Sequence, residues 1–162
     1  MPHAEQSAET RFDSDRAILD PYIPSRSPSD RPDVTVYGYW PYWGEPLDTL
    51  AWDQLTHVAL FGVELKEDGS LAETERSTRH AQDALRYGGE HNVNIHLTLI
   101  SFSDEVHAAV LPDPTRRARA ISELSELLAA EGGHGINIDI EGLNRDRKDD
   151  FVRFVEECAE AF

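Results

Sequence analysis

The 162-residue sequence predicts an α/β fold in which the strands of a parallel sheet alternate with helices. Apolar, β-branched segments recur along the chain from residue 34 onward, and segments with helical spacing separate them. Glycine pairs and an Asp-Pro capping signal mark where helical segments begin and end. Because parallel strands are joined by right-handed crossovers, this alternation predicts βαβ units. Hydrophobic residues make up 40% of the chain, enough for the core of one domain.

The first two predicted strands are Val34–Trp40 and Thr56–Leu65, both rich in β-branched and aromatic residues. The connection between them is irregular, because Leu47–Asp53 is too short for a stable helix. After the second strand, Glu67–Ser70 contains an Asp-Gly pair, which is the signal of a hairpin turn.

A helix is predicted over Thr74–Tyr87, closed by Gly88 and Gly89, and a third strand over Val93–Phe102. The residues of this strand form a near-continuous apolar set.

The next helix has clear signals at both ends. Asp113 is predicted to cap it, Pro114 to occupy its first position, and the Gly132-Gly133 pair to end it. Its predicted buried face carries five apolar residues at helical spacing: Ala118, Ile121, Leu124, Leu127 and Leu128.

A last helix is predicted to open at Asp149 or Asp150. Cys158, the sole cysteine, cannot form an intramolecular disulfide, and its place on an apolar face predicts a buried thiol. The predicted buried side of this helix carries Phe151, Phe154, Val155, Cys158 and Phe162.

The run Gly135–Glu141, between these two helices, carries the candidate chemistry. Alternation along a strand places Asn137, Asp139 and Glu141 on one face, and the isoleucines between them on the other. Two carboxylates that share a face disfavour each other's ionised form, which is how a general acid is held protonated. The alternative is a core strand with a few polar residues at its end.

Four segments together resemble the first half of a family 18 glycoside hydrolase, the chitinase-like family: Val36–Trp40, Leu55–Phe61, Ile95–Phe102 and Gly135–Glu141. The resemblance runs from Val34 to the end of the chain. It implies a TIM-type (β/α)8 barrel of which about the first four βα units are present, so that residues 34–162 form the first half of a catalytic domain. We therefore expect 1–162 to be the front part of a longer protein and to be inactive alone.

The family's signature, Asp-x-x-Asp-x-Asp-x-Glu, lies on the fourth barrel strand. Laid onto this chain, its final Glu falls on Glu141 and its third Asp on Asp139, while its second Asp meets Asn137 and its first meets His134. This variant resembles the Asn-Ile-Asp-Phe-Glu version of bacterial relatives that act on peptidoglycan or are poorly characterised.

The resemblance implies hydrolysis of β-1,4-linked N-acetylglucosamine polymers, chitin or peptidoglycan, by substrate-assisted retaining catalysis without metal or cofactor. Glu141 would then be the general acid, and Asp139 would orient the 2-acetamido group of the sugar. Asn137 could hydrogen-bond but could not carry charge. The alternative is a chitinase-like protein that binds such polysaccharides without cleaving them.

Further candidates lie near the ends of the predicted strands. Aromatic residues after the first strand suit stacking on sugars, and at least one of them is expected to contact substrate; the alternative is that they cap the core. His57, His96 and His134 lack the spacing of metal ligands and are predicted to be structural. The residues predicted to bind substrate are Tyr39, Trp40, Trp43, Phe61 and Ser101.

The net charge of -16 argues against nucleic acid or an anionic membrane surface as partner. No stretch is apolar enough for membrane insertion, and the first twenty residues lack the apolar core of a signal peptide. Residues 1–33 are polar and proline-rich, which predicts a disordered leader or linker. An extracellular or cell-envelope location is expected from the substrate class alone.

Overall fold

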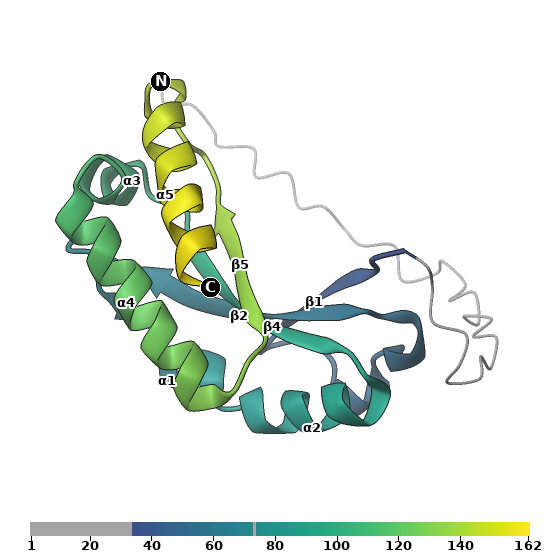
Figure 1. Cartoon of the computed structure of the whole chain (residues 1–162). Helices are drawn as coiled ribbons and strands as arrows, with labels where there is room; N and C mark the ends of the chain where they lie inside the picture. The colour runs from purple at the N-terminus through teal and green to yellow at the C-terminus, as the bar shows by residue number, and fades with distance from the viewer. Residues whose placement is uncertain (1–33, 73) are drawn as a thin grey trace, which may run out of the picture.

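The computed structural model describes residues 34–72 and 74–162 of the chain (Figure 1). The predicted leader over residues 1–33 lies outside the described residues. Four parallel strands, in the order β1-β2-β4-β5, make up the main sheet. They are β1 (Tyr37–Pro41), β2 (His57–Leu65), β4 (Asn94–Ser101) and β5 (Gly135–Ile140). This arrangement confirms the predicted α/β fold with a parallel sheet.

A short strand, β3 (Leu71–Ala72), pairs antiparallel with the end of β2, so the predicted hairpin turn at Glu67–Ser70 is confirmed. Its turn is closed by Asp68, whose Oδ1 accepts hydrogen bonds from the backbone N–H (3.0 Å) and the hydroxyl (2.6 Å) of Ser70. Between β1 and β2 the chain forms two single 3-10 turns, Leu47–Thr49 and Trp52–Gln54, where no regular helix was expected.

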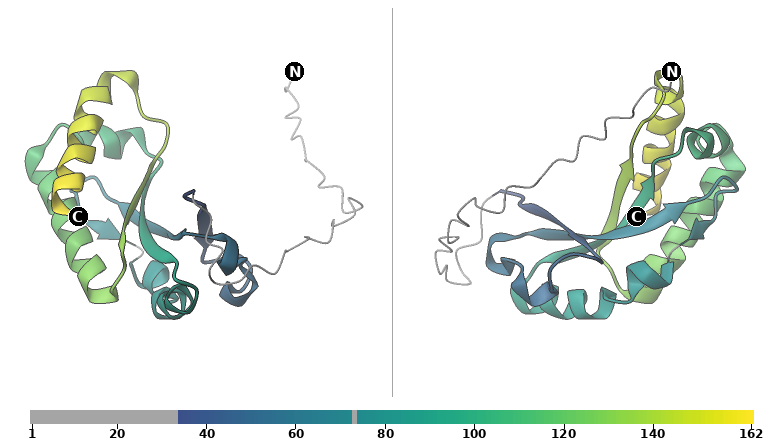
Figure 2. Two further views of the ribbon diagram at one scale, coloured as in Figure 1. Left: turned by 45° about the vertical axis from the view of Figure 1, so that its right-hand side comes forward. Right: turned by 180° about the vertical axis from the view of Figure 1, so that it is seen from behind.

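The helices connect the strands and cover one side of the sheet. They are α1 (Thr74–Thr78), α2 (Ala81–His91), α3 (Asp104–Val110), α4 (Pro114–Glu131) and α5 (Lys148–Ala161), with a further 3-10 turn over Arg145–Arg147. Figures 1 and 2 show α4 and α5 lying beside one another on one side of β5. Among the described residues, no helix combines the length and the apolar character that crossing a membrane requires.

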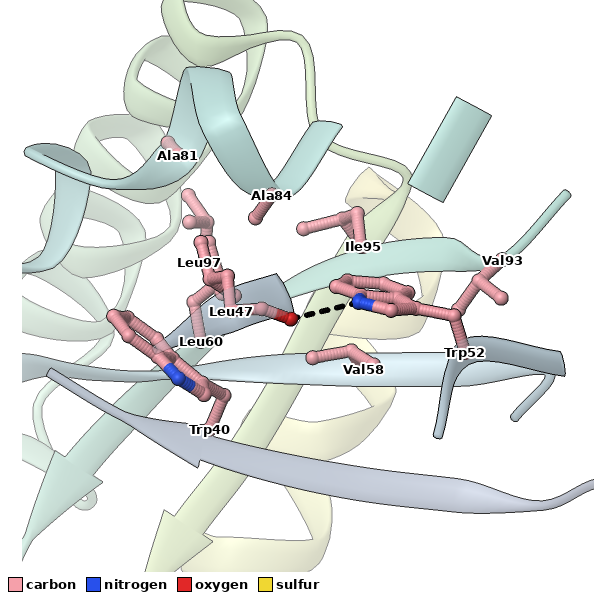
Figure 3. Close-up of a cluster of buried hydrophobic side chains, with 10 residues drawn as sticks. All are labelled: Trp40, Leu47, Trp52, Val58, Leu60, Ala81, Ala84, Val93, Ile95 and Leu97. Atoms are coloured by element: carbon pink, nitrogen blue, oxygen red, sulfur yellow. Dashed lines mark hydrogen bonds between the residues drawn. The ribbon is translucent and has the colours of Figure 1, made fainter. Parts of the chain in front are cut away.

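One core cluster lies between the sheet and the elements that precede β4 (Figure 3). Trp52 is 4% exposed, and its indole N–H donates to the carbonyl of Leu47 (2.8 Å), which fixes the two 3-10 turns against the sheet. The cluster is made of Trp40, Leu47, Trp52, Val58, Leu60, Ala81, Ala84, Val93, Ile95 and Leu97.

The second core cluster lies between β4, β5 and the helices α3, α4 and α5. An ion pair between a buried arginine and a half-buried glutamate joins two of these helices: the Arg117 guanidinium donates to both carboxylate oxygens of Glu157, at 2.7 and 2.8 Å, and to the carbonyl of Leu111 at 2.7 Å. Because Arg117 is 3% exposed, these three bonds replace the water that its charge would otherwise require.

The helix predicted over Thr74–Tyr87 is two helices, α1 and α2, and the second runs past Gly88 and Gly89. It ends at Asn92, which adopts the left-handed conformation (φ 59°). Gly88 is therefore inside the helix, where a Cβ would lie 2.7 Å from the carbonyl oxygen of Val93. The glycine serves close packing of α2 on β4 and does not end the helix.

The signals of α4 are confirmed. Asp113 accepts hydrogen bonds from the backbone N–H groups of Thr115 (2.8 Å) and Arg116 (3.3 Å), and Gly132 ends the helix with φ 80°. The predicted buried face was partly wrong, because Ala118 is exposed while Arg117 is buried with Ala120 and Leu124.

The last helix begins at Lys148, and its buried residues are Phe154 and Cys158. Burial raises the pKa of the Cys158 thiol to about 12, as expected of an inert core cysteine. Val155 and Phe162 are exposed (37% and 45%), so their predicted burial was wrong.

Two smaller differences concern helix and strand ends. Helix α3 was not predicted; the hydroxyl of Ser103 caps it by accepting from the backbone N–H of Val106 (3.4 Å). The first strand begins at Tyr37 and not at Val34, which is 65% exposed.

Candidate active site

The inner face of the sheet, away from the core clusters, carries the polar residues of β5. Ile136, Ile138 and Ile140 pack against the helix-side core. Alternation therefore directs Asn137 and Asp139 to the opposite face, as predicted. Glu141 extends this pattern by one residue, because its backbone N–H donates to the carbonyl of Ser101 (3.0 Å) beyond the end of β5.

A cavity of about 400 Å³ opens at the carboxyl ends of β1 and β5, beside the middle of β2. It brings together two carboxylates and three aromatic rings from segments up to about 100 residues apart in the sequence. Its lining residues are Tyr39, Pro41, Trp43, Phe61, Asp139 and Glu141. Five of them were predicted as site residues; Pro41 was not.

Tyr39 and Asn137 meet over the inner face. The hydroxyl of Tyr39 donates to Oδ1 of Asn137 at 3.3 Å, although β2 and β4 separate their strands in the sheet. The sheet is thus curved enough for side chains of its two outermost parallel strands to touch. Among the described residues, Nδ2 of Asn137 and Oγ1 of Thr98 are buried without a hydrogen-bond partner, and these two residues are neighbours in register.

Thr98 was missed by the sequence analysis. Its signal was a polar residue within the near-continuous apolar set of the third predicted strand. The register places Thr98 beside both Phe61 and Asn137, and it is fully buried. The Thr98 side chain therefore lies on the same face of the sheet as Asn137.

Aromatic rings form the wall opposite the carboxylates. Trp43 and Phe61 meet edge to face, with ring centroids 5.4 Å apart, and Tyr42 contacts Trp43 in the same way at 4.5 Å. Trp43 is nevertheless 62% exposed. An apolar ring held in place by neighbours but still open to water is suited to stacking against a sugar.

A shift in the register of β2 lies directly after Phe61, the residue that β2 contributes to the cavity. The pairing of β2 with β4 shifts between Phe61 and Val63. Gly62 lies at the shift, where a Cβ would come within 2.8 Å of the Ile100 side chain. A larger residue would therefore push β2 away from β4 beside the cavity.

The prediction that Trp40 binds substrate was wrong. Trp40 is 6% exposed and belongs to the core cluster on the helix side, and its indole N–H donates to the carbonyl of Glu45 (2.8 Å). The physical reason is alternation: Tyr39 and Pro41 point into the cavity, so the residue between them points away.

The prediction for Ser101 was also wrong. Ser101 is 2% exposed and pairs in register with Ile140, which packs against the helix-side core. Its carbonyl lies 3.2 Å from Nε2 of His107 on α3. Ser101 thus contributes to the junction of β4 and α3 and does not line the cavity.

The three histidines singled out in the sequence lie away from the cavity, toward the amino ends of the strands, and each is hydrogen-bonded. Within residues 34–72 and 74–162, no group of three His, Cys, Asp or Glu side chains could hold a metal ion. The chemistry that the cavity itself offers is that of two carboxylates beside aromatic rings.

Comparisons of the sequence with protein-family models and with curated proteins found no match. Solved structures, in contrast, share the fold. A chitinase from Bacteroides thetaiotaomicron superposes with a TM-score of 0.69 at 21% identity, covering 76% of this chain and 42% of that one. The spore cortex-lytic enzyme SleL of Bacillus megaterium gives 0.65 at 18% identity, covering 77% and 31%.

A mutant family 18 chitinase from Cycas revoluta, in complex with (GlcNAc)4, gives a TM-score of 0.63 at 21% identity, covering 77% of this chain and 39% of that one. The chain therefore spans less than half the length of the structures it resembles. Its parallel sheet with alternating helices has the architecture of part of a TIM barrel.

Proposed function

We propose that residues 34–162 form the first half of a family 18 glycoside hydrolase domain that cleaves β-1,4-linked N-acetylglucosamine polymers. The observation that carries this proposal is the cavity at the strand ends, where Asp139 and Glu141 face the rings of Tyr39, Trp43 and Phe61. Catalytic residues of TIM barrels lie at this carboxyl end of the strands. The shared fold of chitinases and cortex-lytic enzymes supports the same assignment.

In the proposed reaction, Glu141 protonates the glycosidic oxygen while the acetamido oxygen of the substrate attacks the anomeric carbon. The glycosidic bond breaks and an oxazolinium ion forms. Asp139 orients the acetamido group and stabilises the positive charge that develops on it. Water then opens the oxazolinium and returns its proton to Glu141, so the product retains its configuration.

Asn137 is proposed to position Asp139 without adding charge. Its amide is held by the hydroxyl of Tyr39, and a neutral amide cannot share a negative charge with a neighbouring carboxylate. Among the described residues that line the cavity, the charged groups are then Asp139 and Glu141.

The aromatic wall is proposed to bind the sugar rings. The ring of Trp43 is exposed, and Phe61 and Tyr42 contact it edge to face. Because these contacts already restrict the Trp43 side chain, stacking on a sugar costs little conformational entropy. Both chitin and peptidoglycan contain N-acetylglucosamine, and the solved structures that share the fold include a chitinase with bound (GlcNAc)3 and a spore cortex-lytic enzyme.

A second candidate function is binding of the same polysaccharides without cleavage. One observation favours it: residue 137 is an asparagine, whereas the family that the chain resembles has an aspartate at this position of its signature. The presence of Glu141 on the cavity wall favours the enzyme.

Incubation of the full-length protein with (GlcNAc)4 distinguishes the two functions. Hydrolysis to shorter oligomers with the β-anomer formed first, followed by NMR, is the result expected of the retaining enzyme. Saturable binding without products would support the binding protein. The absence of both binding and hydrolysis of (GlcNAc)4 and of peptidoglycan fragments would contradict both.

A further inference from the structure

A cluster of titratable rings lies at the amino end of the inner face, opposite the candidate active site. Tyr37 begins β1, His57 begins β2, His96 is near the start of β4, and His134 directly precedes β5. These four residues, here called the histidine cluster, therefore come from all four parallel strands or their immediate approach.

Three rings of the cluster, those of Tyr37, His57 and His96, are in mutual contact. The hydroxyl of Tyr37 and Nδ1 of His96 share a hydrogen bond of 2.9 Å. The Tyr37 ring stacks on His57 with centroids 5.6 Å apart, and His57 meets His96 edge to face at 5.1 Å. A proton taken up by one imidazole is thus placed close to the next.

The hydrogen bonds of His134 require an unprotonated ring nitrogen. Its Nδ1 accepts from the backbone N–H of Ile95 at 3.0 Å, and its own backbone N–H donates to the carbonyl of Ile95 at 2.7 Å. An imidazolium has no free lone pair, so protonation at Nδ1 breaks the first of these bonds. That bond connects His134, the residue before β5, to Ile95 on β4.

His57 is also bound through both ring nitrogens. Nδ1 lies 2.9 Å from the hydroxyl of Thr56, which itself donates to the carbonyl of Val36, so Nδ1 is the donor of this pair. Nε2 is left as the acceptor of the Asn94 amide at 3.2 Å. The observed partners are those of the neutral ring.

No carboxylate of the described residues pairs with the cluster, although the chain has 31 Asp and Glu residues. Among the described residues, no carboxylate oxygen lies within 4.0 Å of the ring nitrogens of His57, His96 or His134. His91 shows the contrast, because its Nδ1 lies 2.8 Å from Asp53.

Burial and two neighbouring histidines oppose the charged form of His96. Burial, and then the neighbouring His57 and His134, lower the pKa of His96 below its usual range. Burial, and then Tyr39, raise the pKa of Tyr37 to about 12, so Tyr37 supplies no counter-charge. The other polar neighbours, Thr56 and Asn94, are neutral.

We propose that the histidine cluster is a pH-sensitive device that holds the amino end of the sheet together only while its imidazoles are neutral. Proton uptake charges neighbouring rings that lack a carboxylate and removes the His134 bond to Ile95. The same strands carry Tyr39 and Asn137, two and three residues beyond Tyr37 and His134, so loosening at this end reaches the candidate site. The proposal does not depend on the proposed function.

The direction follows from linkage. A histidine whose pKa is lowered in the folded state binds fewer protons there than in the unfolded chain. Its contribution to stability is therefore complete above the ordinary value of about 6.5 and is lost as the pH falls below it.

Urea unfolding of the full chain between about pH 8 and pH 5 tests the proposal, with wild type, His96→Asn and His91→Asn compared. Asparagine keeps an acceptor near the position of Nδ1 for Tyr37 but cannot titrate. We expect the wild-type midpoint to fall on acidification below about pH 6.5, and the larger part of this fall to disappear in His96→Asn. The control His91→Asn leaves the cluster intact and should keep the fall. Equal slopes for wild type and His96→Asn would overturn the proposal.

Histidine ring NMR of the wild type decides the question if His96→Asn does not fold. The proposal requires a cluster imidazole that remains neutral at a pH where exposed histidines have gained their proton. Simultaneous titration of all imidazoles at their ordinary pH would overturn it.

Discussion

The hydroxyl of Tyr39 on β1 donates a hydrogen bond of 3.3 Å to the side-chain amide of Asn137 on β5, across the inner face of the sheet. The two residues are 98 positions apart in the chain, and two strands separate theirs in the sheet. The sheet therefore curves enough to bring Tyr39 of β1 to the same cavity as Asp139 and Glu141.

Removal of this hydrogen bond should reduce turnover more than stability. In Tyr39→Phe the amide of Asn137 loses its donor, and a bond of this kind contributes about 1 kcal/mol, or roughly a fivefold change in rate. Tyr39 is 57% exposed, so the unfolding midpoint should hardly move. In a double-mutant cycle, Asn137→Ala should add little to Tyr39→Phe. Fully additive losses in kcat would show that the two side chains act separately.

Replacement of the amide by a carboxylate should alter the pH dependence of the proposed reaction. Asn137→Asp adds a negative charge beside Asp139, which disfavours ionisation of the neighbouring carboxyl groups. The acid limb of the pH-rate profile should therefore move to higher pH. A profile and rate identical to those of wild type would place position 137 outside the charge network of the site.

The two neighbouring tryptophans should respond in opposite ways. Trp43→Ala removes an exposed ring of the cavity wall and should weaken binding of (GlcNAc)4 by about 1 kcal/mol, or roughly fivefold in Kd, with little loss of stability. Trp40→Ala empties a core position and should cost about 3–5 kcal/mol of unfolding free energy. Calorimetric titration and urea unfolding of both variants check the pair. A large stability loss in Trp43→Ala with unchanged affinity would remove it from the site.

The Arg117–Glu157 pair should stabilise the packing of α4 against α5. Glu157→Gln leaves the buried guanidinium without its carboxylate and should cost about 1.5–3 kcal/mol near neutral pH, whereas the exposed Glu156→Gln on the same helix should cost almost nothing. The Arg117 side chain lowers the pKa of Glu157. Its contribution is therefore present above about pH 4.5 and is lost as the pH falls through the lowered value.

Urea unfolding at several pH values measures this difference. The gap between wild type and Glu157→Gln should shrink in acid. A gap that stays constant down to pH values where carboxylates are protonated would mean that packing, and not charge, is the cause.

The face of β5 could be predicted from the sequence because alternation within Gly135–Glu141 is strict. Isoleucines occupy every second position, so burial of one face fixes the direction of Asn137, Asp139 and Glu141. The capping signals of α4 are equally local: Asp113 and Gly132 act on the residues next to them.

The errors concern properties that depend on the pairing of distant strands. Tyr39 and Trp40 are both aromatic, and the register with β2 decides which of them faces the cavity. Ser101 depends in the same way on β4, whose pairing with β2 shifts at Gly62. Gly88 carries the local signal of a helix end, but its function is close contact with β4, which no local pattern reports.

The most direct test of the account is the activity of Glu141→Gln in the full-length protein on (GlcNAc)4, with Glu156→Gln as the matched control. Glutamine keeps the shape of the side chain but cannot donate the proton, so binding should persist while turnover falls by roughly 10²- to 10⁴-fold. The control should behave as wild type. Turnover of Glu141→Gln within a few-fold of wild type would contradict the assignment of Glu141 as the general acid.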